Sequence, residues 1–128
     1  MGDRLMLDTD VIVDYLRGQD QAAEFLESCS ETLMVSAITV AELFAGVRDG
    51  RERTALSAFL GAFEVVSISR EVAERGGLHR RDFGKSHNTG LADALIAAGT
   101  QDAGARLVTL NARHFPMLPD VLIPYRKP

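Results

Sequence analysis

Residues 4–18, Arg-Leu-Met-Leu-Asp-Thr-Asp-Val-Ile-Val-Asp-Tyr-Leu-Arg-Gly, contain the transition on which the fold prediction depends. The apolar run at residues 5–7 ends abruptly at Asp8, and a helical pattern follows it until Gly18. A continuous apolar run is typical of a parallel strand that is buried on both faces. Open α/β sheets bind their ligands beyond the carboxyl ends of such strands, so Asp8 is predicted to lie at a functional edge.

The rest of the chain alternates short apolar runs with helical patterns. Strands are predicted at 33–35, 65–68 and 107–110, with a fifth at 121–123; helices are predicted at 21–29, 40–47, 56–63 and 91–98. Residues 70–87 predict a poorer helix, because Gly76-Gly77 interrupts the pattern. This alternation predicts a single α/β domain over residues 1–128, in three layers (α/β/α), with a central, mostly parallel sheet of four to five strands.

Composition excludes several classes of protein. The 128 residues are 46% hydrophobic and suffice for one domain with a real core, and no apolar stretch approaches the roughly 20 residues of a membrane helix. The N-terminus lacks the apolar region of a signal peptide, which favours a cytoplasmic location.

Cys29 is the only cysteine, which excludes an internal disulfide and a cysteine-based zinc cluster. The net charge of −4 argues against tight nonspecific nucleic-acid binding by the whole chain.

Four polar side chains fall at the ends of predicted elements: Asp8, Glu42, Asp93 and Asn111. Two follow strands and two lie in the first turns of helices, and in a parallel sheet these ends share one edge. Three carboxylates that lie close together must take up protons or bind a cation. Oxygen ligands without histidine or cysteine suit Mg²⁺ or Mn²⁺. The set therefore favours metal-assisted hydrolysis of a phosphodiester.

Three of these residues also have a purely structural interpretation. Thr39 and Glu42 have the spacing of a capping box, in which Glu42 bonds a free backbone N–H. Asp93 would complement the dipole of its helix, and Asn111 is a common turn residue. The pattern alone leaves both interpretations open for each residue.

The other charged residues differ in how strongly the pattern favours a functional role. Asp8 ends a buried strand and needs a partner, which favours a functional role. Asp10 and Asp14 are predicted to be solvated helix residues, although Asp10 is close to Asp8 in sequence. The basic stretch at 75–87 would either contact substrate phosphates or form a solvated helix face. The same two interpretations apply to the arginines at 48, 51 and 53.

Four sequence blocks, in order, carry a resemblance to a known family. They are Leu-Asp-Thr-Asp-Val-Ile at 7–12, Ser-Ala-Ile-Thr-Val-Ala-Glu-Leu at 36–43, Leu-Ala-Asp-Ala-Leu-Ile-Ala-Ala at 91–98 and Val-Thr-Leu-Asn-Ala-Arg-His-Phe at 108–115. The chain resembles PIN-domain proteins, specifically the VapC-type toxin ribonucleases of bacterial toxin–antitoxin pairs. The resemblance spans nearly the whole chain and implies a parallel sheet flanked by helices and RNA cleavage that depends on Mg²⁺ or Mn²⁺.

The resemblance also implies roles for individual residues. Asp8, Glu42 and Asp93 match the acidic metal-site residues, and Thr9 and Thr109 match hydroxyl-bearing supports. Asn111 stands where many relatives carry a fourth acid, so the resemblance does not imply a fully occupied two-metal site. Asp10 stands where relatives more often carry Asn or Ser, and it restores some of the missing charge.

Partners are implied in the same way. Members of this family form homodimers, and each toxin is inhibited by a small antitoxin that lays a chain segment into a groove. The helices predicted at 21–29 and within 39–62 are the candidate surfaces for such contacts. No membrane partner is expected.

Two alternatives compete with the ribonuclease. Asp8-Thr9-Asp10 approximates the start of a haloacid-dehalogenase-like phosphatase, in which Asp8 is a nucleophile and Asp10 a general acid. That scheme gives no role to the block around Glu42. The other alternative is a PIN fold that binds RNA without cutting it, which the amide at Asn111 leaves open.

Overall fold

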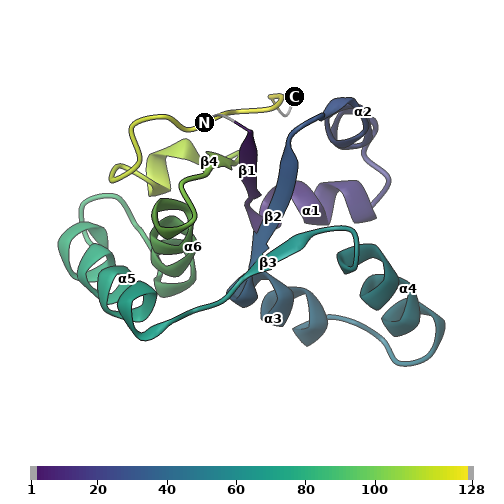
Figure 1. Ribbon diagram of the computed structural model, residues 1–128, viewed down its shortest axis with the longest axis horizontal. Helices are drawn as coiled ribbons and strands as arrows, with labels where there is room; N and C mark the ends of the chain where they lie inside the picture. Colours follow the sequence, from purple (N-terminus) through teal and green to yellow (C-terminus); the bar gives the residue numbers. More distant parts are fainter. Residues whose placement is uncertain (1–2, 127–128) are drawn as a thin grey trace.

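A four-stranded, all-parallel sheet runs through the centre of the molecule (Figure 1). The computed structural model describes residues 3–126. The strands, in the spatial order β3-β2-β1-β4, are β1 (Arg4–Leu7), β2 (Thr32–Ser36), β3 (Glu64–Val66) and β4 (Arg106–Val108). The chain therefore extends the sheet from β1 to β3 in one direction and returns to the other side of β1 with β4. This reversal makes the neighbours β1 and β4 the topological switch point, where open α/β sheets have their crevice.

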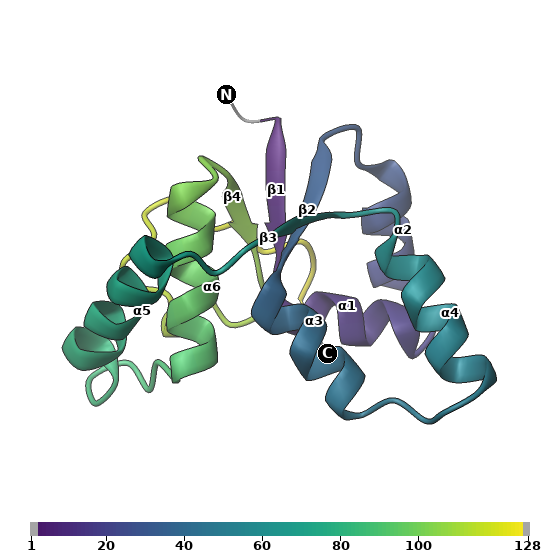
Figure 2. The ribbon, with the colours of Figure 1, turned by 60° about the horizontal axis from the view of Figure 1, so that its bottom comes forward.

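Helices cover both faces of the sheet, which confirms the predicted three-layer α/β/α arrangement. They are α1 (Thr9–Leu16), α2 (Asp20–Ser28), α3 (Ala37–Ala45), α4 (Arg51–Leu60), α5 (Arg70–Phe83) and α6 (Leu91–Asp102), followed by a short 3₁₀ turn at Ala112–His114. Figure 2 shows α5 and α6 on one side of the strands and α1 to α4 on the other.

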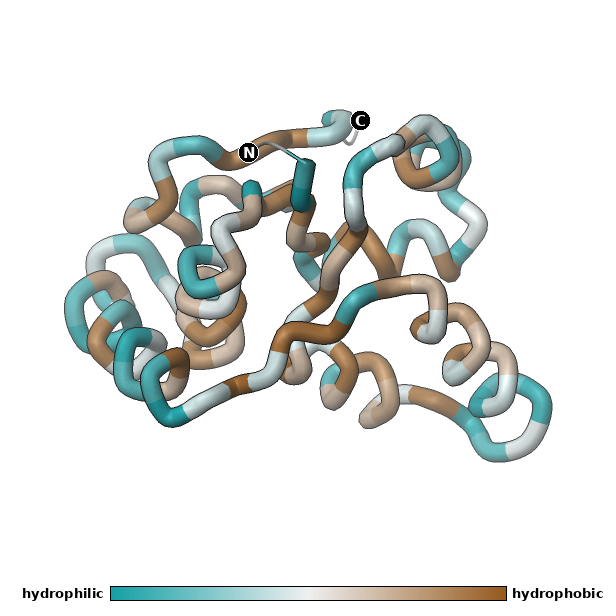
Figure 3. The backbone as a smooth tube through the Cα atoms, in the orientation of Figure 1, coloured by the Kyte–Doolittle hydropathy of each residue, from teal (hydrophilic) through white to brown (hydrophobic). Residues whose placement is uncertain are grey.

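Successive residues of β1 explain why its sequence is apolar throughout. Leu5 and Leu7 belong to a core cluster that includes residues of α1 and α4, whereas Met6 belongs to a second cluster with Ile96 of α6. Side chains of a strand alternate between faces, so a strand covered on both faces must be apolar at every position. The hydropathy-coloured tube in Figure 3 is brown along much of β2 and β3 and teal in the turn between α3 and α4.

The predicted fifth strand is reduced to a single parallel bridge between Val108 and Leu122. The Leu122 N–H donates to the Leu107 carbonyl at 2.8 Å, and the Leu122 carbonyl accepts from Thr109 N–H at 3.0 Å. Proline cannot donate to a ladder, and Pro119 and Pro124 flank this segment, so the pairing ends after one residue.

The C-terminal segment also reaches α1. The hydroxyl of Tyr125 donates to Asp14 Oδ2 at 2.9 Å, and Asp14 is only 6% exposed. The prediction that Asp14 is a solvated helix residue is therefore wrong. Its partner is 111 positions away in the sequence, which no local pattern reveals.

The glycine pair in α5 does not interrupt the helix, in contrast to the prediction. Gly76 is buried against α6: a Cβ built on it would lie 2.6 Å from Leu95 Cδ2 and 3.3 Å from Leu95 Cα. The glycine thus permits a close approach of two helices rather than a break. Gly77, its neighbour, would meet nothing within 4 Å.

This pair offers a matched test of helix packing. We expect Gly77→Ala to raise the free energy of unfolding by about 0.5–1 kcal/mol, because alanine restricts the unfolded chain and favours a helix. Gly76→Ala should instead lower it by about 1 kcal/mol, because the overpacking against Leu95 exceeds the gain in helix propensity. Urea titrations of the two variants measure both effects, and stabilisation by both substitutions would contradict the close packing of α5 on α6.

Within residues 3–126, none of the helices is both long enough and apolar enough to cross a membrane.

Candidate active site

Asp8 lies at the switch point between β1 and β4. Its backbone N–H donates to the Val108 carbonyl at 2.9 Å, which continues the β1–β4 pairing by one residue. Its side chain caps the N-terminus of α1 by accepting from Thr9 N–H at 2.8 Å, and the strand therefore passes directly into a helix. The second carboxylate oxygen, Oδ2, accepts from the Thr109 hydroxyl at 2.7 Å.

The environment of Asp8 disfavours its charge. The residue is 6% exposed. Burial, together with the negative charges of Asp10 and Asp93, raises the pKa of the Asp8 carboxyl to about 7. The hydrogen bonds from Thr109 and Thr9 oppose this effect without cancelling it. The charges of Asp10 in α1 and of Asp93 in α6 thus both act on Asp8, which follows β1. The sequence predicts this convergence for Asp93, and for Asp10 it indicates closeness to Asp8 along the chain.

Asp10 is part of this site, and the prediction of a solvated helix residue is wrong for it too. The side chain is half-buried and points to the loop after β4. Its Oδ2 accepts from Leu110 N–H at 3.2 Å and from Asn111 Nδ2 at 3.3 Å. Asp10 therefore holds residues 110–111 against α1.

Asn111 is brought to the site as predicted, and its side-chain amide faces a carboxylate. Its backbone N–H donates to Thr109 Oγ1 at 3.0 Å, so the threonine that supports Asp8 also shapes the turn. The side chain itself remains exposed. An amide beside Asp10 supplies a hydrogen-bond donor where a carboxylate would add a further negative charge.

Glu42, in α3, is joined to the site by a hydrogen bond from the Thr9 hydroxyl. The capping-box interpretation is wrong, because α3 begins earlier: Ser36 is its N-cap and accepts from Ile38 N–H at 3.2 Å. Glu42 consequently lies in the second turn, and its Oε1 accepts from the Thr9 hydroxyl at 2.7 Å. Thr39, fully buried, lies 3.0 Å from the same hydroxyl. Thr9 and Thr109 thus each place a hydroxyl on a carboxylate, which is the supporting position that the resemblance implies.

Asp93 lies in the first turn of α6, where its position was predicted. Its Oδ2 is 3.4 Å from Nδ1 of His114, a residue of the 3₁₀ turn after β4. The Thr89 hydroxyl donates to the His114 carbonyl at 2.8 Å and ties this turn to the start of α6. Sequence reasoning missed His114 as a neighbour of the site. The available signal was its place in the fourth block, three residues after Asn111.

The donor set suits a hard divalent cation. Within residues 3–126, no three acidic, histidine or cysteine side chains lie close enough together to enclose an ion by themselves. Mg²⁺ does not require such a cage, because it keeps several water ligands and commonly binds through one or two carboxylates. Asp8 and Asp93 are two carboxylates close enough for the charge of Asp93 to raise the pKa of Asp8, and a cation would relieve that repulsion.

The basic side chains weighed in the sequence are exposed. Those at residues 75–87 lie along the second half of α5 and in the turn after it, and Arg81 pairs with Asp82 at 2.8 Å. At the start of α4, Arg48 pairs with Glu52 and Arg53 pairs with Asp49. Such exposed pairs contribute little to stability.

Comparison with known proteins agrees with this geometry. The PIN domain family model matches residues 5–119. Ribonuclease VapC19 of Mycobacterium tuberculosis is 39% identical over 125 residues, which cover 94% of this chain and 98% of that protein. Ribonuclease VapC10 of the same species is 35% identical over 127 residues, with 97% and 95% covered.

Solved structures give the same result. The toxin–antitoxin complex from Klebsiella pneumoniae contains a chain that superimposes with a TM-score of 0.83 at 28% identity, covering 96% of this chain and 99% of that one. FitAcB from Neisseria gonorrhoeae superimposes with a TM-score of 0.74 at 28% identity, with 94% and 97% covered. The chain belongs to the PIN-domain family, in its branch of VapC-type toxin ribonucleases. The phosphatase alternative is thereby set aside.

Proposed function

We propose that this chain cleaves RNA internally with the help of Mg²⁺ or Mn²⁺, and that the metal is held by Asp8 and Asp93. The observation that carries the proposal is the buried Asp8, whose pKa is raised to about 7 by burial and by the charges of Asp10 and Asp93. The ionised form of such a carboxyl group is disfavoured at neutral pH, and a bound cation would stabilise it. A bound divalent ion supplies an activated water and offsets charge that develops on the phosphoryl oxygens.

The other residues position these groups. Thr109 and the start of α1 fix both oxygens of Asp8, so the carboxylate keeps one orientation. Glu42 is exposed and is held by Thr9 at 2.7 Å, which suits it to bind the metal directly or through a water that it orients. Asn111, whose side-chain nitrogen donates to Asp10, is suited to orient a water through its amide oxygen.

The activity is tested on a mixed RNA pool with the purified protein. In Mg²⁺ or Mn²⁺ we expect discrete cuts, which disappear on addition of EDTA. Asp93→Asn should also remove them, whereas Asp20→Asn, the same change at an exposed residue of α2, should leave them intact. Cuts that persist in EDTA would contradict the metal mechanism. RNA that is bound but never cut, with either metal, would favour the inert binding module.

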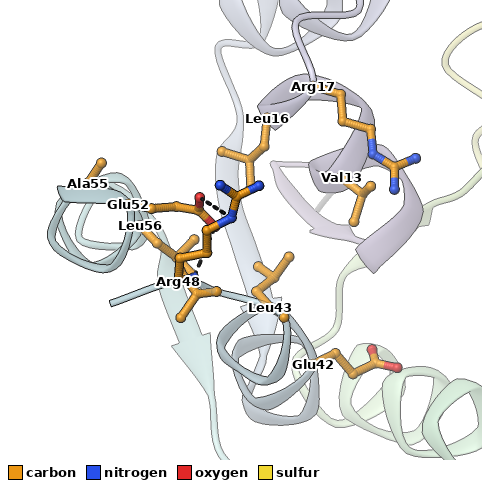
Figure 4. Close-up of a pocket in the computed structure, with 11 residues that line it drawn as sticks. Val13, Leu16, Arg17, Glu42, Leu43, Arg48, Glu52, Ala55 and Leu56 are labelled. Atoms are coloured by element: carbon orange, nitrogen blue, oxygen red, sulfur yellow. Dashed lines mark hydrogen bonds and ion pairs between the residues drawn. The ribbon is translucent and has the colours of Figure 1, made fainter. Parts of the chain in front are cut away.

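We further propose a cognate antitoxin as partner, docked in a groove between α1, α3 and α4. The solved relatives include toxin–antitoxin complexes from Klebsiella pneumoniae and other bacteria. The groove, of about 750 Å³, has an apolar floor that includes Leu43 and Leu56, and Arg17 and Arg48 line it as well (Figure 4). Glu42 lies at one end and connects the groove to the acidic site (Figure 4). A segment with apolar side chains and one basic residue would complement these features.

The groove contains only part of the partner surface that the sequence predicts. α3 and α4, within the predicted range 39–62, line it, whereas no residue of α2 does. Leu43→Arg should abolish binding of a purified antitoxin while RNA cleavage by the toxin alone persists. We also propose that the chain forms a homodimer, which light scattering of the purified protein measures.

A further inference from the structure

A second hollow adjoins the acidic site, next to the C-terminal segment. This C-terminal pocket has a volume of about 430 Å³ and is lined by Asp10, Leu110, Asn111, Ile123, Tyr125 and Arg126. It shares no lining residue with the groove of Figure 4, which meets the acidic site through Glu42. The acidic residues are therefore bordered by two separate hollows. The proposed metal chemistry gives no role to the second one.

The walls of the C-terminal pocket are fixed by hydrogen bonds. Asp10 holds Leu110 and Asn111 through the contacts at 3.2 and 3.3 Å. Tyr125, on the other side, is held by its 2.9 Å bond to the buried Asp14. A pocket whose walls are already ordered loses little conformational entropy when a ligand binds.

The lining side chains define the chemistry of a ligand. Arg126 is an exposed cation, and Ile123 is an exposed aliphatic residue, 38% accessible. A carboxylate only accepts hydrogen bonds, so the nitrogen of the Asn111 amide faces Asp10 and its oxygen is the group that it offers a ligand. An apolar wall, an acceptor and a cation together match three parts of a nucleotide: its base, an N–H donor on the base edge, and its phosphate.

We propose that the C-terminal pocket binds one nucleotide of the RNA next to the bond that is cleaved. The base packs on Ile123 and Leu110, a neighbouring phosphate pairs with Arg126, and the Asn111 oxygen accepts from an N–H donor on the base edge. The inference rests on the proposed RNA cleavage and adds a determinant of where the cut falls. A basic antitoxin residue is a poorer occupant, because Arg126 would repel it.

The test measures RNA binding in a background that does not cut. Protein carrying Asp8→Asn is titrated into fluorescein-labelled hexamers of A, C or U at several salt concentrations, and the anisotropy is recorded. We expect all three hexamers to bind, because each base offers an N–H donor to the Asn111 oxygen. Arg126→Ala should reduce the slope of log K against log salt by about 0.7, the value for one lost phosphate contact on a single strand. Arg126→Lys should retain the slope.

Matched controls distinguish an effect of this pocket from the general effect of removing one charge or one apolar side chain from the surface. Arg51→Ala removes an exposed arginine of α4 and should leave the slope unchanged. Ile123→Ala should weaken hexamer binding about fivefold, whereas Val65→Ala, at a 48% exposed residue of β3, should not. An unchanged salt slope in Arg126→Ala, together with unchanged affinity in Ile123→Ala, would overturn the proposal.

Failure of this inference is distinguishable from failure of the proposed function. The same two substitutions in the otherwise native sequence should change the preferred cut positions in an RNA pool. Cleavage at unchanged positions would refute the nucleotide pocket and leave the nuclease intact, whereas no cleavage by the native protein would refute the nuclease itself. Weaker binding of an antitoxin without any effect on RNA would assign the pocket to the antitoxin and also overturn the proposal.

Discussion

Asp8→Asn is expected to abolish RNA cleavage and, in the metal-free protein, to raise thermal stability at neutral pH. Activity should fall at least about 100-fold, since even residues that only support a metal ligand commonly cost that much. Stability should rise because the substitution removes a buried charge that two hydrogen bonds compensate only in part when the metal is absent. Opposite effects on activity and stability are the signature of a residue kept for function.

The sign of the pH dependence follows from the direction of the pKa shift. The pKa of Asp8 is raised in the folded protein to about 7, so between pH 4 and 7 the folded state binds a proton that the unfolded state has lost. The contribution of Asp8 to stability is therefore greatest at the acidic end and is lost as the pH rises through 7. Asp8→Asn lacks this dependence.

The expected size of the effect follows from the same shift. A pKa of about 7 means that ionised Asp8 costs up to about 4 kcal/mol relative to the neutral form. An asparagine cannot accept from both Thr9 N–H and the Thr109 hydroxyl, and the lost hydrogen bond costs about 1 kcal/mol. The net gain should be about 1–3 kcal/mol at pH 8 and should shrink toward pH 5.

Thermal melts in EDTA at pH 5 and pH 8 measure this prediction. Asp20→Asn serves as the control, since its carboxylate is exposed in the first turn of α2 and its removal should shift both melts downward by the same small amount. Addition of Mn²⁺ at pH 8 should stabilise the native protein, by about 2.7 kcal/mol at one hundred times the dissociation constant, and the Asp8→Asn variant much less. If the native protein and Asp8→Asn are equally stable in EDTA at both pH values, the charge of Asp8 does not destabilise the folded state.

The sequence was sufficient to predict the α/β architecture and to bring Asp8, Glu42, Asp93 and Asn111 to one edge of the sheet. These predictions succeed because they depend only on where a strand or helix ends, which local patterns indicate. The contact of Glu42 was not predictable in this way. Thr39 and Glu42 have capping-box spacing, yet Ser36 starts the helix three residues earlier, and Glu42 bonds a threonine 33 positions away instead.

Long-range contacts account for the other errors. Asp10 is half-buried because it accepts from Leu110, 100 positions later, and a helix position alone gives no sign of this. Gly76 was interpreted as a break because glycine has a low helix propensity, but its role is to admit Leu95 from α6. In each case the deciding partner is remote in sequence, so composition and periodicity carried no information about it.

Tyr125→Phe is expected to lower the free energy of unfolding by about 2 kcal/mol, a large loss for the removal of one hydroxyl. The hydroxyl donates to Asp14 Oδ2 at 2.9 Å, and Asp14 is only 6% exposed. Hydrogen bonds to charged groups contribute about 1.5–3 kcal/mol, and phenylalanine removes one such donor from a carboxylate that water cannot reach to replace it. Tyr15→Phe, at a ring that stacks on Phe59, is the control and should cost much less.

The free energy of unfolding at alkaline pH tests the hydrogen bond between Tyr125 and Asp14 independently. Burial, the hydrogen bond to Asp14 and the charges of Asp14 and Asp10 all raise the pKa of Tyr125 above its ordinary value. Above pH 10 the unfolded chain ionises this tyrosine and the folded protein does not, so native stability should fall as the pH rises. Urea titrations at pH 8 and pH 10.5 should therefore show a smaller difference between the native protein and Tyr125→Phe at the higher pH. A difference that stays the same at both pH values would mean that the hydroxyl is not held by Asp14, and that the C-terminal segment is anchored to α1 by apolar packing alone.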